Sequence, residues 1–178
     1  MLLKRLGLPF EAVAPQIGER PRQGERPVDL VLRLACDKAE AVANSRPEAV
    51  VIGSDQVAMH EGRLIGKPGS AERAADQLEA FSGQTVEFLT SVAVIRGGDA
   101  LIGEAVVETR VEFRRLEREE IRRYLRADEP FDCAGSFKAE SLGPALFESA
   151  FSQDPTALIG LPLIETARLL RMAGFQVP

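Results

Sequence analysis

Residues 50–68 read VVIGSDQVAMHEGRLIGKP, and this stretch decides the fold that we expect. It opens with a short apolar run, residues 50–52, which a glycine and a serine interrupt before the acid Asp55. A short apolar run bounded by a turn signal is typical of a buried strand. Ligand sites in α/β folds gather at the carboxyl ends of such strands. We therefore predict that a strand ends here and presents Asp55 at an edge of the sheet.

Lys67 stands farther along the same stretch, between a glycine and Pro68. Proline disfavours the α region for the residue before it, so we expect extended backbone at Lys67. A carboxylate and an ammonium on rigid backbone beside a strand suit the binding and cleavage of a phosphate ester. Asp55 could act as a general base on water, hold a divalent cation that bridges phosphates, or satisfy backbone amides in a turn.

The composition limits the class of protein. The 178 residues carry a net charge of −5, which argues against a bulk electrostatic grip on nucleic acid but leaves room for a small polyanion. Cys36 and Cys133 fit neither a disulfide framework nor a metal-ligand spacing. No apolar run reaches the roughly 18 residues of a membrane span, and no signal peptide pattern is found. We therefore expect a single cytoplasmic domain, residues 1–178, that binds neither a nucleic acid polymer nor a membrane.

A helix is predicted over residues 28–44. Its apolar residues Val31, Ala35 and Val42 recur at helical spacing, and Lys38 falls on the same face. A lysine on an inward face either extends its ammonium to the rim or points it into a site. The pattern alone leaves both alternatives open.

Caps, turns and periodicity predict the remaining elements. They are the end of a helix at residues 1–7, an irregular loop at 8–27, a helix from Ser70 to residue 81, strands at 85–95 and 101–113 joined by a hairpin at 96–99, a charged helix at 117–127, a last strand at 158–161 and a final helix that Pro162 opens. Strands and helices mix without strict alternation. We therefore predict one α/β domain with a mixed sheet and helices packed on it.

Residues 134–140 read AGSFKAE and form a second candidate site. If this segment is extended, Ser136, Lys138 and Glu140 project to one face. A hydroxyl, a cation and an acid would then stand in a row beside a glycine that allows close approach of a ligand. The glutamate would accept hydrogen bonds from the edge of a base, and the lysine would pair with a phosphate or with the glutamate. An exposed edge strand with alternating polar residues is the alternative explanation.

Three further polar residues need an interpretation. Glu19 lies in the loop at residues 8–27, and Asp154 precedes a proline, so that either could supply a metal ligand. His60 is the only histidine of the chain, and we expect it on a surface loop. The sequence contains no Walker A motif and no GxGxxG motif.

Five motifs occur in order along the chain: VVIGSDQV, GKP, FSGQTVEFLTS, DCAGSFKAES and DPTALIGLPLI. In this combination the chain resembles the Maf family of nucleoside triphosphate pyrophosphatases over essentially its whole length. The resemblance implies an elongated, inosine-triphosphatase-like α/β fold with a mixed sheet and a nucleotide cleft between two lobes. It also implies cleavage of a nucleoside triphosphate between the α and β phosphates, giving a monophosphate and pyrophosphate, with Mg²⁺ or Mn²⁺ as the divalent metal cation.

The resemblance also implies roles for individual residues. Asp55 matches the family's proton acceptor, which activates the attacking water. Lys38 and Lys67 match its phosphate-binding lysines, which favours a functional role for Lys38. Glu19 matches an acid near the metal, so Glu19 and Asp55 are the metal ligands that the resemblance implies.

The family's base-specificity positions correspond to Gln56 and Glu140. Members that act on dTTP and UTP have a threonine after the catalytic aspartate, a histidine after the Ser-Gly pair and an AYAIQG-type run. This chain has Gln56, no histidine near residues 82–83, and the run SFKAE, which is similar to the branch that hydrolyses 7-methyl-GTP. A carboxylate suits the N1–H and amino donors of guanine, or a positively charged methylated ring. The alternatives are a dTTP/UTP pyrophosphatase of the sister branch and a catalytically impaired nucleotide-binding protein.

The chain departs from the family pattern in three places. The family begins with a strand and an SxSPxRR loop that grips the triphosphate, and this sequence, which starts at Met1, lacks that segment. We therefore expect a domain that is N-terminally truncated relative to the family. Ser91 and Ser141 stand where the family usually has glycine. Homodimers are usual in the family, although the sequence carries no interface signature.

Overall fold

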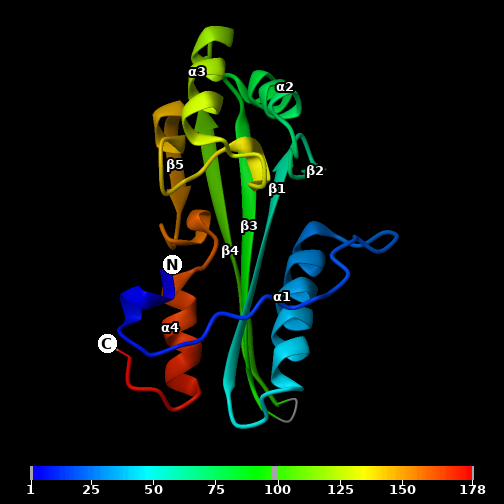
Figure 1. The fold of residues 1–178 in the computed structure, drawn as a ribbon, viewed down its shortest axis with the longest axis vertical. Coiled ribbons are helices and arrows are strands. Elements are labelled where there is room, and N and C mark those ends of the chain that lie inside the picture. Colours follow the sequence, from blue (N-terminus) through cyan, green and yellow to red (C-terminus); the bar gives the residue numbers. More distant parts are fainter. Residues whose placement is uncertain (1, 98–99, 178) are drawn as a thin grey trace. The chain divides into compact units, whose positions relative to one another are not determined.

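The computed structural model describes residues 2–97 and 100–177 and combines a five-stranded sheet with α-helices (Figure 1). The elements are α1 (Pro27–Ala43), β1 (Val50–His60), β2 (Arg63–Ile65), α2 (Ala71–Phe81), β3 (Thr85–Arg96), β4 (Ala100–Phe113), α3 (Arg118–Asp128), β5 (Phe147–Ser152) and α4 (Leu163–Met172). The strand order is β2-β1-β3-β4-β5, and β2 and β5 pair antiparallel with their neighbours. The predicted α/β class is confirmed. Within the described residues, no helix has the length and apolar character needed to cross a membrane.

The chain divides into two compact units. The first contains Met1–Gln56, Leu89–Val107 and Asp154–Pro178, and the second contains Val57–Phe88 and Glu108–Gln153. The three long strands β1, β3 and β4 each contribute residues to both units.

In the first unit, the two faces of the sheet are covered by different helices. Val51 of β1 packs with alanines of α1, whereas Val50 and Ile52 pack with residues that include Leu169 of α4. Successive side chains of a strand point to opposite faces, so this alternation places α1 and α4 on opposite sides of the strands (Figure 1).

Gly53 lets α1 approach β1 closely. A Cβ atom at this position would lie 2.0 Å from the carbonyl oxygen of Ala35 and 2.8 Å from the amide nitrogen of Ala39. The prediction that the strand stops at residues 53–54 was therefore wrong, because the glycine serves helix–strand contact and not a turn. β1 continues to His60, and Asp55 lies inside the strand.

The helices predicted beyond residue 27 and the hairpin strands are confirmed, whereas Leu2–Leu6, predicted as the end of a helix, form a 3₁₀ helix. α1 begins with Pro27 in its first turn, where a proline loses no helical hydrogen bond. α2 begins after Ser70, whose side chain accepts a hydrogen bond from the Arg73 amide at 3.3 Å. The strands β3 and β4 lie where the sequence predicts them, and residues 98–99 of their connection are outside the described residues.

In the second unit, the core is aromatic. The ring of Phe137 makes edge contacts with Phe88, Phe113 and Phe147, with ring centroids 4.9–5.8 Å apart. Edge-to-face pairs at such distances contribute beyond the burial of their area. The phenylalanine in the middle of the AGSFKAE run is therefore an anchor of this core.

The last strand was predicted in the wrong place. Residues 158–161 do not form a strand; a 3₁₀ turn covers Ala157–Ile159, and the fifth strand is β5. Thr156 donates its amide and its hydroxyl to Asp154, at 2.9 and 2.6 Å, which favours a turn over a sheet ladder. The expectation for His60 was also wrong, because it lies in β1 and pairs with Arg63 of β2.

Candidate functional site

Lys38 lies between two carboxylates in the first unit. Its Nζ is 2.5 Å from Asp55 Oδ1 and 2.9 Å from Glu19 Oε1. The side chains of Lys38 and Asp55 are 21% and 12% exposed, whereas that of Glu19 is 51% exposed. Helix α1, strand β1 and the loop at residues 8–26 thus bring their charged groups to one place.

The local fold explains why Asp55 and Lys38 meet. Asp55 is two residues beyond Gly53, so both point from β1 toward the same face, on which α1 packs. Lys38 is three residues beyond Ala35, the helix residue that Gly53 contacts, and residues at this spacing share a helix face. The Lys38 ammonium is therefore held between Asp55 and Glu19, and its role in a functional site stays a prediction.

The carboxylates keep the Lys38 ammonium charged. Burial alone would lower the pKa of Lys38, but the hydrogen bonds to Asp55 and then Glu19 outweigh it, and the pKa is raised above its ordinary value. A charged ammonium held between two carboxylates can transfer one of its hydrogen bonds to an incoming phosphate oxygen.

Arg33 fixes the loop that carries Glu19. Its guanidinium contacts both carboxylate oxygens of Glu25, at 2.6 and 2.9 Å, and donates to the carbonyl oxygen of Arg20 at 3.2 Å. Glu19 directly precedes Arg20, so the hydrogen bond from Arg33 to the Arg20 carbonyl oxygen restrains the backbone beside Glu19. Sequence reasoning missed Arg33 and Glu25; the available signal was an arginine on α1 followed one turn later by Asp37, which it also contacts at 3.0 Å.

Gln56 lies next to Asp55 in sequence but on the other face of β1. Its Nε2 donates to Thr90 Oγ1 at 2.9 Å and lies within hydrogen-bond distance of the carbonyl oxygens of Ala157 and Leu158. The amide nitrogen therefore holds the 3₁₀ turn at residues 157–159 against the sheet. The sequence did not predict this contact between Gln56 and the turn. Gln56 is next to Asp55 in the chain, but neighbouring residues of a strand point in opposite directions.

Ser91 joins β3 to α1 close to Asp55. It is fully buried, and its hydroxyl lies 2.7 Å from the carbonyl oxygen of Val31 and 3.3 Å from that of Asp55. Its hydroxyl thus adds a strand–helix hydrogen bond.

Asp154 has a structural task. Its carboxylate accepts hydrogen bonds from both the amide and the hydroxyl of Thr156, and from the Ile164 amide at 2.6 Å in the first turn of α4. The third of these bonds caps the helix N-terminus. The Asp154 carboxylate thus ties its own turn to the start of α4, and Glu19 and Asp55 as metal ligands stay a prediction.

Lys67 belongs to the second unit, in the connection between β2 and α2, and its side chain is exposed. The backbone around it is fixed on both sides. The carbonyl oxygen of Gly66 accepts a hydrogen bond from Gln77 Nε2 at 3.0 Å, and the amide of Gly69 donates to the carbonyl oxygen of Phe131 at 2.8 Å. An exposed ammonium on restrained backbone suits the binding of an anion.

The segment at residues 134–140 is a turn, and the expectation of one shared face was wrong. Gly135 and Ser136 adopt left-handed backbone, with φ of 76° and 59°. Ser136 is buried and donates to Gln77 Oε1 at 2.5 Å, whereas Glu140 is exposed. The physical reason is the insertion of Phe137 into the aromatic core, which takes its neighbours out of an extended path.

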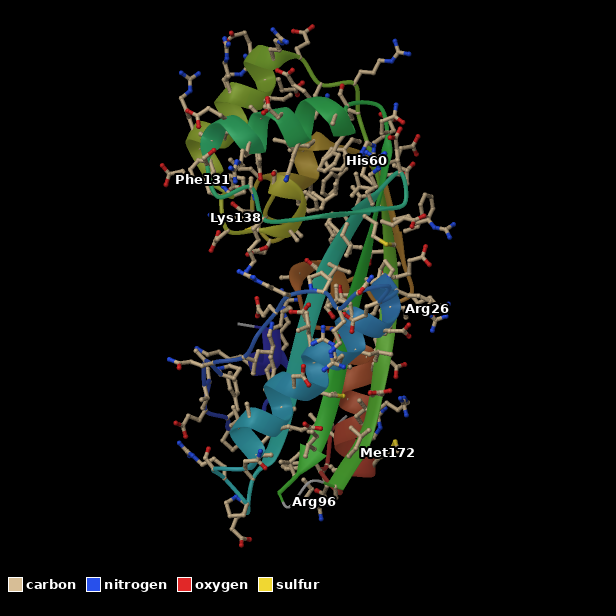
Figure 2. The ribbon with its side chains drawn as sticks, turned by 90° about the vertical axis from the view of Figure 1, so that its right-hand side faces the viewer. Arg26, His60, Arg96, Phe131, Lys138 and Met172 are labelled. Atoms are coloured by element: carbon tan, nitrogen blue, oxygen red, sulfur yellow. The ribbon has the colours of Figure 1, made fainter. Side chains whose placement is uncertain are left out.

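The buried carboxylate of Asp128 organises the end of this segment, where Lys138 lies (Figure 2). Asp128 accepts hydrogen bonds from Tyr124 at 2.9 Å and from Ser141 at 2.6 Å. Lys138 donates its ammonium to the carbonyl oxygen of Asp128 at 2.5 Å and its amide to the Tyr124 hydroxyl at 3.0 Å. Burial, with a contribution from Asp128, raises the pKa of Tyr124, so the phenol stays protonated. Ser141 and Lys138 are therefore both members of this hydrogen-bond network.

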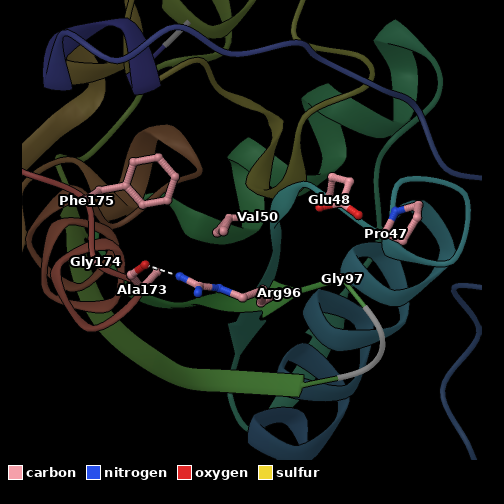
Figure 3. Close-up of a pocket in the computed structure, with 8 residues that line it drawn as sticks. All are labelled: Pro47, Glu48, Val50, Arg96, Gly97, Ala173, Gly174 and Phe175. Atoms are coloured by element: carbon pink, nitrogen blue, oxygen red, sulfur yellow. Dashed lines mark hydrogen bonds between the residues drawn. The ribbon is translucent and has the colours of Figure 1, made fainter.

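A pocket of about 420 Å³ opens in the first unit away from these residues (Figure 3). Its eight lining residues are Pro47, Glu48, Val50, Arg96, Gly97, Ala173, Gly174 and Phe175. Arg96 donates to the carbonyl oxygen of Ala173 inside it. None of the residues that the sequence singles out for chemistry lines this pocket.

Comparison with known proteins identifies the family. A family model described as Maf-like protein matches residues 1–173. The chain belongs to the Maf family. Proteins named 7-methyl-GTP pyrophosphatase from Xanthomonas axonopodis pv. citri (strain 306) and Pseudomonas aeruginosa are 53% and 49% identical to this Maf-family chain over 177 residues, which cover 99% of the chain and 92% of each relative. A protein of the same name from Polaromonas sp. is 53% identical over 173 residues, covering 97% of the chain and 79% of the relative.

Proposed function

We propose that this chain hydrolyses 7-methyl-GTP, or a closely related modified nucleotide, to the monophosphate and pyrophosphate. Relatives at about half identity and nearly full coverage carry the name of that activity. The observation that carries the proposal is the group formed by Lys38, Asp55 and Glu19, in which one ammonium is shared by two carboxylates.

Asp55 is the proposed general base. Water attacks a phosphorus atom of the triphosphate, the anhydride bond between the α and β phosphates breaks, and the water's proton passes to the Asp55 carboxylate. Lys38 stays protonated throughout and donates a hydrogen bond to a phosphate oxygen, which stabilises the charge that builds up there.

Glu19 and Asp55 are the proposed ligands of a divalent cation. Within the described residues, no group of three or more histidine, cysteine, aspartate or glutamate side chains could hold a metal alone. Mg²⁺, however, is usually bound by one or two carboxylates together with substrate phosphates, and these two carboxylates already share one cation, Lys38. The metal, Mg²⁺ or Mn²⁺, would neutralise phosphate charge when bound with the nucleotide.

The remaining assignments follow from the family pattern and the exposed side chains of the second unit. Lys67 is proposed to bind phosphate, and Glu140 is proposed to recognise the base through a carboxylate that accepts from guanine donors. Gln56 is proposed to act on base selection through the turn that its amide nitrogen holds. We place the reaction in the cytoplasm, since Cys36 and Cys133 are both free thiols.

The substitution Asp55→Asn tests the proposed general base. We expect turnover to fall by about 10²- to 10⁴-fold, because an amide cannot accept the proton of the water. The measurement is pyrophosphate release from 7-methyl-GTP with Mn²⁺, on protein shown by circular dichroism and thermal melting to be folded.

The matched control for that experiment is Asp76→Asn, which makes the same chemical change on the exposed face of α2. The control should keep wild-type turnover. Full activity in a folded Asp55→Asn protein would rule out this carboxylate as the base.

A further inference from the structure

Gln77 joins two segments that are far apart in the sequence. Its Nε2 donates to the carbonyl oxygen of Gly66 at 3.0 Å, and its Oε1 accepts from the Ser136 hydroxyl at 2.5 Å. Gly66 precedes Lys67 directly, and Ser136 opens the segment that leads to Glu140. One side-chain amide on α2 therefore touches both the phosphate-binding and the base-recognition segments of the second unit.

The bond to Gln77 supports an unfavourable backbone conformation at Ser136. This serine has a φ of 59°, a region that residues other than glycine rarely adopt. Its side chain is fully buried, so its hydroxyl needs a partner inside the protein, and Gln77 provides the acceptor. The preceding Gly135 also has a positive φ, of 76°, and a Cβ there would lie 2.7 Å from the Phe88 ring, so the backbone packs closely against this ring. The turn is therefore held in place through Ser136.

The backbone next to Lys67 depends on the donor half of the same amide. Beyond Lys67, Pro68 is buried and the Gly69 amide is bonded to Phe131. On the near side, the carbonyl oxygen of Gly66 receives the Gln77 hydrogen bond. Lys67 is exposed between these two fixed points, so the position of its ammonium depends on both.

We propose that Gln77 is a positioning residue that couples phosphate binding to base recognition. The donor half of its amide would hold Lys67 in place, and the acceptor half would hold the turn that orients Glu140. This inference rests on the proposed function, in which Lys67 binds phosphate and Glu140 recognises the base. The inference adds that a displacement of the segment with Lys67, or of the segment with Glu140, is transmitted to the other segment through Gln77.

Two substitutions separate the halves of the amide. Gln77→Glu keeps an acceptor for Ser136 but replaces the donor to Gly66 by a carboxylate oxygen. We expect KM to rise about three- to tenfold for 7-methyl-GTP and GTP alike, with their ratio of kcat/KM unchanged. Ser136→Ala keeps the bond to Gly66 but removes the bond to the turn, and we expect the ratio of kcat/KM for 7-methyl-GTP over GTP to fall about three- to tenfold.

Gln77→Met removes both hydrogen bonds with little change in volume, and should show both effects together. If the bond between Gln77 and Ser136 carries the selectivity, adding Ser136→Ala to Gln77→Met should lower the ratio no further. Gln153→Met, on an exposed glutamine, is the matched control and should keep wild-type kinetics.

Lys67→Ala and Glu140→Ala distinguish failure of this inference from failure of the proposed function. If these two variants change KM and the base selectivity while every Gln77 variant keeps wild-type kinetics, the coupling role is wrong and the proposed function stands. If Lys67→Ala and Glu140→Ala both keep wild-type kinetics, the proposed roles of Lys67 and Glu140 are wrong, and the inference about Gln77 is wrong with them. A Gln77→Met protein that melts at lower temperature but keeps its KM and selectivity would show a purely structural role and overturn the inference.

Discussion

At the scale of single residues, ion pairs set the charge state of the loop beside the site. The hydrogen bonds from the Arg33 guanidinium, together with the amide of Arg22 at 2.9 Å, lower the pKa of Glu25 from 4.5 to about 2. The side chains of Glu25 and Arg33 are only 9% and 13% exposed. The loop that presents Glu19 is therefore anchored by a pair that stays charged under ordinary conditions.

This anchor predicts a pH dependence of stability. A carboxylate whose folded pKa is depressed contributes stability above its unfolded pKa, near 4.5, and the contribution is lost as the pH falls toward 2. Glu25→Gln should lower the free energy of unfolding at pH 7, and the difference from wild type should shrink at pH 2.5. Urea unfolding at both pH values measures this. An equal difference at both would contradict a charged anchor.

The charged residues of the candidate site were easier to predict from the sequence than the residues that hold the neighbouring backbone in place. Lys38 and Asp55 stand out because a charge among apolar neighbours breaks a periodic pattern. Arg33 and Gln77 act through backbone carbonyl oxygens of distant segments, at Arg20 and Gly66. No sequence pattern marks such contacts, because any residue offers the same carbonyl group.

At the scale of elements, the packing of α1 on β1 is what places Lys38 against Asp55. The contact depends on a glycine, because the carbonyl oxygen of Ala35 occupies the place of a side chain at Gly53. A rigid helix and a rigid strand in direct contact hold a charged pair more accurately than loops do.

Gly53→Ala should therefore be one of the most damaging small substitutions in the chain. The new methyl group would have to displace the backbone of α1, at a cost of about 2–4 kcal/mol in the free energy of unfolding. Gly18→Ala is the matched control, because a Cβ there meets nothing within 4 Å. Urea denaturation of both variants measures the difference, and a Gly53→Ala protein within about 0.5 kcal/mol of wild type would disprove the close contact.

Among the elements, prediction succeeded where one local signal agreed with the final packing. The Ser70 cap and the apolar runs of β3 and β4 are examples. It failed at β5, whose exposed and half-buried residues give no strong strand pattern, and at residues 134–140, where the burial of Phe137 overrode the alternation of polar side chains. Burial among distant rings is a tertiary effect that local patterns do not contain.

At the scale of the whole molecule, three strands pass through both compact units. Each of the strands β1, β3 and β4 begins in one unit and ends in the other. Unfolding of one unit would therefore disrupt strands that the other unit also needs. We therefore expect the chain to unfold in one cooperative transition.

The two cysteines report on this, because Cys36 belongs to the first unit and Cys133 to the second. Burial raises the pKa of Cys36 to about 12 and that of Cys133 to about 11, so both thiols should react slowly at pH 8 in the folded protein. In a urea series, labelling of each thiol, followed by mass spectrometry, should show the same midpoint. Reaction of one thiol at clearly lower urea would mean that the units unfold separately.

The central claim is that this Maf-family chain acts on a methylated guanine nucleotide. The most direct test is pyrophosphate release by the 178-residue protein with Mn²⁺ and a panel of 7-methyl-GTP, GTP, dTTP and UTP. We predict turnover that is highest for 7-methyl-GTP. Preference for dTTP or UTP, or no turnover of any of the four by folded protein, would contradict that claim.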